Sequence, residues 1–182
     1  PRALLGGEAV AICGRVRLMH ARVRHLCLQD ERWRLHEWGL PINQHDMLAT
    51  ILLFSSVWMD GVAQIGVALD HGSREDIVHL WRVVGHYLGV EPELLPTRHE
   101  AALQAQAFIH ATQGPPDDDS RALVGAYLDA GAAETTMQGV ARLRRRLAGW
   151  LIAELNPDIA TGLGSALGDA PRRITIDTLA RG

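Results

Sequence analysis

The stretch "GRVRLMHARVRHLCL", Gly14–Leu28, interleaves arginine and histidine with apolar side chains. Its apolar residues recur at the i, i+3, i+7, i+10 spacing of one helical stripe: Val16, Met19, Val23 and Leu26. This spacing predicts a helix over residues 7–28 whose apolar stripe packs against the rest of the protein.

A second stripe on the same predicted helix carries the charge. Arg17, His20 and Arg24 follow the i, i+3, i+7 spacing, and Cys13 and Cys27 extend the stripe at either end. Such groups beside a core stripe can point into a cavity, where an imidazole binds a metal and guanidinium groups hold carboxylates. Spacing alone favours the alternative, which is a basic, half-solvated helix edge.

Helical apolar spacing continues along nearly the whole chain, so we expect an all-α fold. The sequence predicts one domain over residues 1–182, built as a bundle of about six helices. The helix over residues 43–69 has apolar residues on all sides, which predicts a central, buried position. Asn43 is the expected cap of that helix, and Asp119 or Ser120 is the expected cap of a later one.

Two features of the C-terminal part complete this description. The short tail Ile174–Leu179 shows the period-two alternation of a strand, and residues 162–182 are expected to pack loosely. At the other end, a chain that begins at Pro1 is expected to lack its true start.

Composition argues against several kinds of partner. The 182 residues carry a formal net charge of -3, which gives no general attraction to nucleic acid. The arginine run at Arg142–Arg146 would spread over several faces of a helix. The longest apolar run, Met47–Met59, is shorter than the roughly 20 residues that cross a bilayer, so no transmembrane segment is predicted.

The two cysteines bear on the cellular compartment, because disulfide bonds form mainly in oxidising compartments. On one helix, Cys13 and Cys27 would lie about 21 Å apart and could not pair with each other. Unpaired cysteines favour a cytoplasmic location.

A second polar stripe, formed by His79, Arg82 and His86, lies on the predicted helix that follows Ser73. If it faces the stripe around His20, the two would line a polar pocket. If it does not, these groups meet carboxylates at the surface. A di-iron carboxylate site needs two Glu-x-x-His pairs, and only Asp76 stands at the required spacing before His79. We therefore reject a di-iron site.

Three blocks in this order resemble the family of MpaB-type oxygenases and latex-clearing proteins (rubber oxygenases). They are "RVRLMHARVRH", "GLPINQHDMLATILLFSSVWMDGV" and "HLWRVVGHYLGVEPELLP", and the similarity extends over about residues 14–103. The resemblance implies an all-helical protein with a b-type haem, an oxidoreductase that uses dioxygen to cleave carbon–carbon double bonds in isoprenoid chains. His25 also stands where latex-clearing proteins carry a histidine.

The resemblance assigns roles to particular residues. The family's Arg-x-x-His-x-x-x-Arg pattern implies that His20 binds the haem iron and that Arg17 and Arg24 flank it. The stripe formed by His79, Arg82 and His86 supplies further candidates for cofactor binding. The candidate walls of a hydrocarbon channel are Met47, Thr50, Ile51, Phe54 and Trp58. These five side chains fit a plain hydrophobic core equally well.

The chain departs from the family pattern upstream of His20. Relatives carry a helix there with an arginine and a threonine close together, whereas the nineteen residues before His20 contain no threonine and no lysine. Either that helix lies outside this chain or this member lacks it. No catalytic residue is assigned.

Two functions follow from the sequence. The first is a haem-dependent oxygenase that acts on a hydrophobic, isoprenoid or lipid-like small molecule. The alternative is a non-catalytic helical module that binds haem or a hydrophobic ligand, or serves as a dimerising partner. The sequence leaves the formation of a homo-oligomer open.

Overall fold

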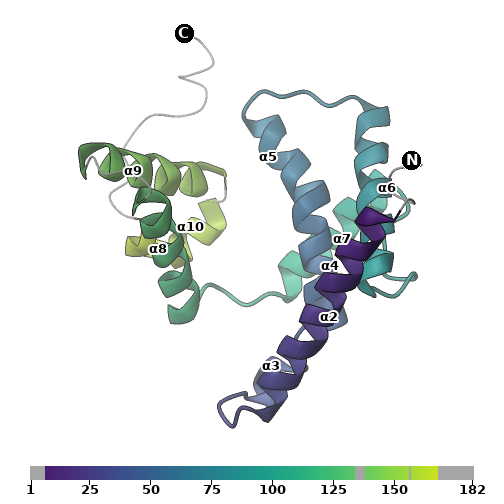
Figure 1. Cartoon of the computed structure of the whole chain (residues 1–182). Coiled ribbons are helices and arrows are strands. Elements are labelled where there is room, and N and C mark those ends of the chain that lie inside the picture. The colour runs from purple at the N-terminus through teal and green to yellow at the C-terminus, as the bar shows by residue number, and fades with distance from the viewer. Residues whose placement is uncertain (1–6, 134–137, 156, 168–182) are drawn as a thin grey trace. The chain divides into compact units, whose positions relative to one another are not determined.

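The computed structural model describes residues 7–133, 138–155 and 157–167 (Figure 1). All regular elements in these ranges are helical, which confirms the predicted all-α class. The predicted strand-like tail, Ile174–Leu179, lies outside the described residues. The chain forms two compact units, one of residues up to 63 with 68–112, the other of residues 64–67 with those from 113 onward. Compactness alone does not show that either unit folds independently, so the single domain stays a prediction.

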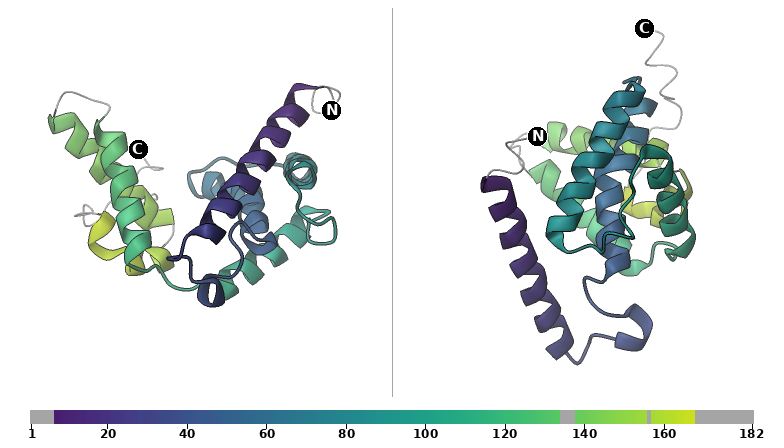
Figure 2. Two further views of the ribbon diagram at one scale, coloured as in Figure 1. Left: turned by 60° about the horizontal axis from the view of Figure 1, so that its bottom comes forward. Right: turned by 90° about the vertical axis from the view of Figure 1, so that its right-hand side faces the viewer.

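In the first unit, helix α2 (Glu8–Gln29) lies at the outside and packs beside helix α6 (His71–Leu88) (Figure 2). The inward side of α2 is the polar stripe: Cys13 is buried, and His20, Arg24 and Cys27 are half-buried. Met19 and Leu26 on the predicted apolar stripe are 54% and 55% exposed. The prediction that the apolar stripe packs inward was therefore wrong, because the polar stripe faces the rest of the unit.

The next elements are a short helix and a long one. Helix α3 (Leu35–Trp38) follows α2 in the connection that was predicted to be polar. Helix α4 (Gln44–Leu52), the π-helical turn η1 (Leu53–Val57) and helix α5 (Trp58–Gln64) then continue one another without a break. The Asn43 side chain accepts a hydrogen bond from the backbone N–H of Asp46, as the predicted cap requires.

This long helix packs on one side only. Ser55 and Ser56 in the π-helical turn are buried, and these small side chains let η1 pack closely against α6 and helix α7 (His99–Thr112). Leu53, Phe54 and Trp58 point away and are 54%, 50% and 49% exposed. The expectation of contacts on all sides therefore holds for only part of the circumference.

Two capped ends fix α6. The Asp70 carboxylate accepts from the backbone N–H of Ser73 at the start, and Gly89 with φ 95° closes the end in the left-handed conformation that favours glycine. The backbone N–H of His99, where α7 begins, donates to the carboxylate of Glu75 on α6. The main buried cluster between α4, α5, α6 and α7 consists of Leu48, Leu52, Met59, Val78, Ala102 and Ile109.

The second unit holds helices α8 (Asp118–Ala133), α9 (Gln138–Leu155), α10 (Pro157–Leu163) and the 3-10 turn η2 (Gly164–Leu167). Asp117 caps α8 by accepting from the backbone N–H of Ser120, so the predicted cap at Asp119 or Ser120 was wrong. Leu163 and Leu167 are buried against Leu128. The described part of residues 162–182 thus packs tightly, contrary to expectation.

Among the described residues, one helix, Gln44–Gln64, is long and apolar enough to cross a membrane by length and composition. It is 33% buried, and core helices of soluble proteins meet the same criterion. The absence of a transmembrane segment therefore stays a prediction.

Candidate functional site

Helices α2, α4 and the end of α6 border a partly open pocket of about 240 Å³. We call it the His20 pocket, and it is lined by His20, Ile42, Asp46, Met47, Thr50, Ile51, Leu88 and Val90. Most of these side chains are aliphatic. The polar ones are an imidazole, a carboxylate and a hydroxyl.

The imidazole of His20 is the least satisfied group in this pocket. Its Nδ1 atom is buried, and no described residue forms a hydrogen bond with it. A buried polar atom without a partner is rare in folded proteins and calls for an explanation. A ligand that enters the pocket beside the ring would supply one.

Arg24 fixes the loop that leads into the pocket. Its Nε donates to the carbonyl of Pro41 at 3.0 Å, and its Nη2 donates to the carbonyl of Ile42 at 2.5 Å. Ile42 has φ 54°, a left-handed conformation that is uncommon for a β-branched residue. Strained residues of this kind are often found at functional sites, held in place by their surroundings. Here the guanidinium group holds the strained residue that lines the pocket.

Arg17 lies one helical turn before His20, and its guanidinium group rests on Gly89. Gly89 is favoured by its φ of 95°, and a Cβ atom there would lie 3.1 Å from Arg17 Cζ, a contact that a small shift of the exposed arginine side chain would relieve. The described residues offer Arg17 no hydrogen bond or ion pair. The charge stands at the C-terminal end of α6, where a cation is favourable.

A side chain that the sequence analysis did not single out holds the same turn from the other side. Gln44 Nε2 donates to the carbonyl of Gly89 at 2.9 Å, and Gln44 Oε1 accepts from the backbone N–H of Glu91 at 3.0 Å. Both bonds flank Val90, which lines the pocket. Gln44 therefore links the start of α4 to the end of α6.

Asp46 brings a carboxylate to the pocket. Its Oδ2 accepts from Asn43 Nδ2 at 2.8 Å, and its Oδ1 lies 3.3 Å from Nδ1 of His45. The hydroxyl of Thr50 donates to the backbone carbonyl of Asp46, so this hydroxyl can only accept from a ligand. The pocket thus contains two oxygen acceptors and one unpartnered imidazole nitrogen.

The predicted channel residues separate into two groups. Met47, Thr50 and Ile51 line the His20 pocket. Phe54 instead stacks on Trp81 of α6, with ring centroids 4.9 Å apart, and Trp58 is half exposed. Neither lines the pocket, and the role of all five in binding a substrate stays a prediction.

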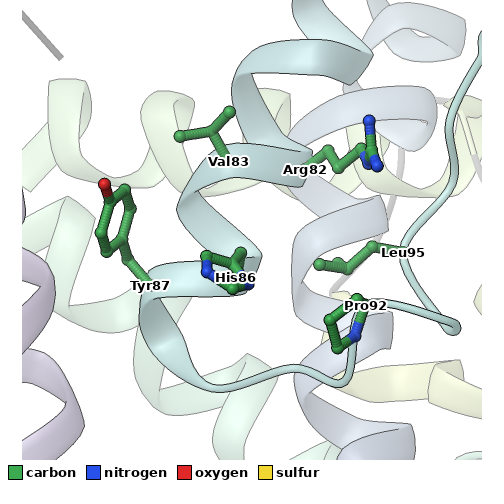
Figure 3. A pocket seen from close by; sticks show the side chains of 6 residues that line it. All are labelled: Arg82, Val83, His86, Tyr87, Pro92 and Leu95. Atoms are coloured by element: carbon green, nitrogen blue, oxygen red, sulfur yellow. The ribbon is translucent and has the colours of Figure 1, made fainter. Parts of the chain in front are cut away.

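The polar stripe of His79, Arg82 and His86 does not line the same pocket as His20. Arg82 and His86 line a separate cavity of about 290 Å³, together with Val83, Tyr87, Pro92 and Leu95, which we call the Arg82 pocket (Figure 3). His79 is exposed and lines neither cavity. The contribution of this stripe to a cofactor site stays a prediction, as do the cofactor roles of Arg17, His20 and Arg24.

The sequence analysis missed four residues of the His20 pocket: Ile42, Asp46, Leu88 and Val90. Leu88 follows the stripe of His79, Arg82 and His86 on the same helix, and Asp46 lies three residues after the predicted cap at Asn43, but neither was assigned to a site. For Val90 a sequence signal was available. A glycine C-cap at Gly89 turns the chain back toward the end of its helix, which brings the next residue close to that helix.

Comparison with known proteins agrees with this fold. The model of the family "ER-bound oxygenase mpaB/B'/Rubber oxygenase, catalytic domain" matches residues 2–181. A rubber oxygenase of Streptomyces sp. (strain K30) is 31% identical over 134 residues, which cover 69% of this chain and 33% of that protein. A structure of latex clearing protein LCP in the closed state superposes with a TM-score of 0.75 at 24% identity, over 91% of this chain and 44% of that one.

The chain spans between a third and a half of the length of these two relatives. Within that span, the family match covers both compact units, and the resemblance noted for residues 14–103 extends over nearly the whole sequence. The chain belongs to the family of MpaB-type and rubber oxygenases, in the part that forms their catalytic domain.

Proposed function

We propose that this chain binds a b-type haem at His20 and contributes to an oxygenase that cleaves carbon–carbon double bonds of an isoprenoid or lipid-like substrate with dioxygen. The single observation that carries the proposal is the buried, unpartnered Nδ1 of His20 in a mainly aliphatic pocket of an oxygenase-family chain. An imidazole is a common axial ligand of haem iron.

The residues around His20 fit such a group. A macrocycle needs apolar walls, and Met47, Ile51 and Leu88 provide them. Its propionates need cationic partners. The guanidinium group of Arg17, which rests on Gly89 beside the pocket and pairs with no described residue, is one such partner.

When bound, the haem supplies the activation of dioxygen. The chain's own residues have three tasks. His20 would hold the iron through its imidazole. The aliphatic walls exclude water from the reacting hydrocarbon, which strengthens every polar interaction inside the pocket. Arg24 has a positioning role, because its hydrogen bonds fix the loop that carries Ile42.

The substrate class rests on the family. The relative from Streptomyces is named a rubber oxygenase, which favours an unsaturated hydrocarbon chain. We include a cytoplasmic location in the proposal, since Cys13 and Cys27 are both free.

An absorbance titration tests the haem site. Haemin added to the purified chain should give a Soret band at one equivalent, and His20→Ala should abolish it. His36→Ala, on the exposed helix α3, is the matched control and should bind haemin like the parent. A chain that takes up no haemin, or a His20→Ala variant with an unchanged spectrum, would contradict the proposal.

A second measurement addresses the reaction. Oxygen uptake by the haem-loaded chain is followed with an unsaturated isoprenoid and with its fully saturated analogue. Uptake with the unsaturated compound alone supports cleavage of a double bond. If haem binds but neither compound causes uptake, the alternative of a non-catalytic haem-binding module is correct.

A further inference from the structure

The Arg82 pocket is built from two rows of side chains on α6 and from the turn that follows the helix. Arg82 and His86 form one i, i+4 row, and Val83 and Tyr87 form the next. Figure 3 shows Arg82 and His86 on successive turns, with Pro92 and Leu95 of the following segment facing them and Tyr87 at the opposite edge. Cationic and apolar groups thus stand side by side.

The apolar wall of this pocket is fixed by the core. Leu95 is buried in a cluster with Ile51 and Val90. It lies so close to α6 that a Cβ atom at Gly85 would be 2.7 Å from Leu95 Cδ2. The segment that carries it is also held by backbone hydrogen bonds, from Val90 N–H to the Gly85 carbonyl at 2.9 Å and from Leu94 N–H to the Glu91 carbonyl at 3.0 Å. The wall is therefore formed before any ligand arrives.

The cation of the pocket lacks an acceptor. Arg82 is half-buried, and none of the described residues accepts a hydrogen bond from it or forms an ion pair with it. The carboxylates of Glu91 and Glu93, on the segment that bears Pro92, are exposed and make no ion pair with it either. Because no described residue pairs with its guanidinium group, Arg82 can bind an anion without first breaking a bond.

The size of the cavity limits the ligand. Its volume of about 290 Å³ equals roughly ten water volumes, at the low end of small-molecule sites. Such a space holds one anionic head and a chain of a few carbon atoms. A guanidinium fork matches a carboxylate in a bidentate manner, and a hydrocarbon tail gains by contact with Pro92 and Leu95.

We propose that the Arg82 pocket is a second binding site, specific for a small carboxylate with a short hydrocarbon tail. The carboxylate pairs with Arg82 beside His86, and the tail lies on the wall formed by Pro92 and Leu95. No residue of this site lines the His20 pocket. The inference therefore stands independently of the proposed oxygenase function.

Hexanoate is the probe, and its binding is measured by calorimetry and by chemical-shift changes of the backbone amides of α6. We expect saturable binding, at least tenfold tighter than that of acetate, which lacks the tail, and of hexanol, which lacks the charge. Hexyl phosphate separates the two anion chemistries. Equal affinity for hexanoate and hexanol, or tighter binding of hexyl phosphate, would overturn the assignment to a carboxylate.

Two variants locate the site. Arg82→Gln should weaken hexanoate binding at least tenfold, and His86→Glu should do so as well, because it places a carboxylate one helical turn from Arg82. Arg98→Gln is the control, because it removes the same charge from an exposed arginine that pairs with Glu100 at the surface. Far-ultraviolet circular dichroism verifies that each variant is folded.

If Arg98→Gln weakens binding as much as Arg82→Gln does, the attraction is general and the site does not exist. His20→Ala should leave hexanoate binding unchanged. This result also separates failure of the second site from failure of the haem proposal.

Discussion

The two pockets lie on opposite sides of one small buried cluster. Ile51 and Val90 line the His20 pocket, Leu95 lines the Arg82 pocket, and all three pack together. The polar groups differ: an unpartnered imidazole and a carboxylate on one side, an unpaired guanidinium on the other. Changes in the shared cluster should thus affect both pockets, whereas changes in the polar groups should affect only one.

Ile51→Ala gives the largest expected effect. The Ile51 side chain is buried in the shared cluster, so its truncation should lower the free energy of unfolding by about 2–5 kcal/mol. Urea denaturation measures this loss, and both haemin and hexanoate binding should weaken. Leu53→Ala, two residues along the same long helix but half exposed, is the control and should change stability by less than about 0.5 kcal/mol. Equal losses of stability and of binding in the two variants would refute the proposal that this buried cluster supports both pockets.

Gly85→Ala tests the same wall from α6. The new methyl would crowd Leu95 and Ile51, which costs about 1–3 kcal/mol, while alanine favours the helix by about 0.5–1 kcal/mol. We expect a net loss of stability in urea and weaker hexanoate binding. Gly14→Ala on α2 has open space around the new atom and should be stabilising. A stabilised Gly85→Ala protein would show that Leu95 moves aside freely.

Gln44→Leu should distinguish the two pockets. The change removes both hydrogen bonds to the turn around Val90, a loss of about 1 kcal/mol because water can replace part of it. Haemin affinity should fall, because Val90 shifts and so does Gly89, against which the Arg17 side chain packs. Hexanoate binding should change little. Gln104→Leu, exposed on α7, is the matched control; a loss confined to hexanoate binding would contradict the positioning role of Gln44.

Much of the first unit was predictable because its signals are local. The spacing of apolar residues predicted the helices, and the caps at Asn43 and Gly89 set two of their ends. The Arg17, His20 and Arg24 stripe was found by the same periodicity. Which stripe of α2 faces inward was not predictable, because periodicity separates two faces of a helix but does not say which neighbour each one meets.

The site residues that were missed depend on contacts between distant parts of the chain. Gln44 is an ordinary polar residue in the sequence, and its role appears only when α4 meets the end of α6. Val90 enters the pocket because the chain reverses at Gly89. The separation of Arg82 and His86 from His20 likewise depends on the side of α6 that faces α2, which no local spacing encodes.

The smallest expected effect is the loss of helix caps at low pH. It can be compared between α6, which carries parts of both pockets, and α8 in the second unit. The Ser73 backbone N–H and hydroxyl bind the Asp70 carboxylate and lower its pKa below the ordinary 3.8; Ser120 lowers the pKa of Asp117 in the same way. A depressed pKa means that each cap stabilises the fold above about pH 3.8 and is lost as the pH falls through the folded value. Asp70→Asn keeps an acceptor that does not titrate, so the protection of the α6 amides against hydrogen exchange should decline less steeply below pH 4 in this variant than in the parent. Asp117→Asn should leave the α6 amides unchanged and should flatten the decline only for the amides of α8. An equal effect of both variants on the α6 amides would show that the two units do not respond to acid separately.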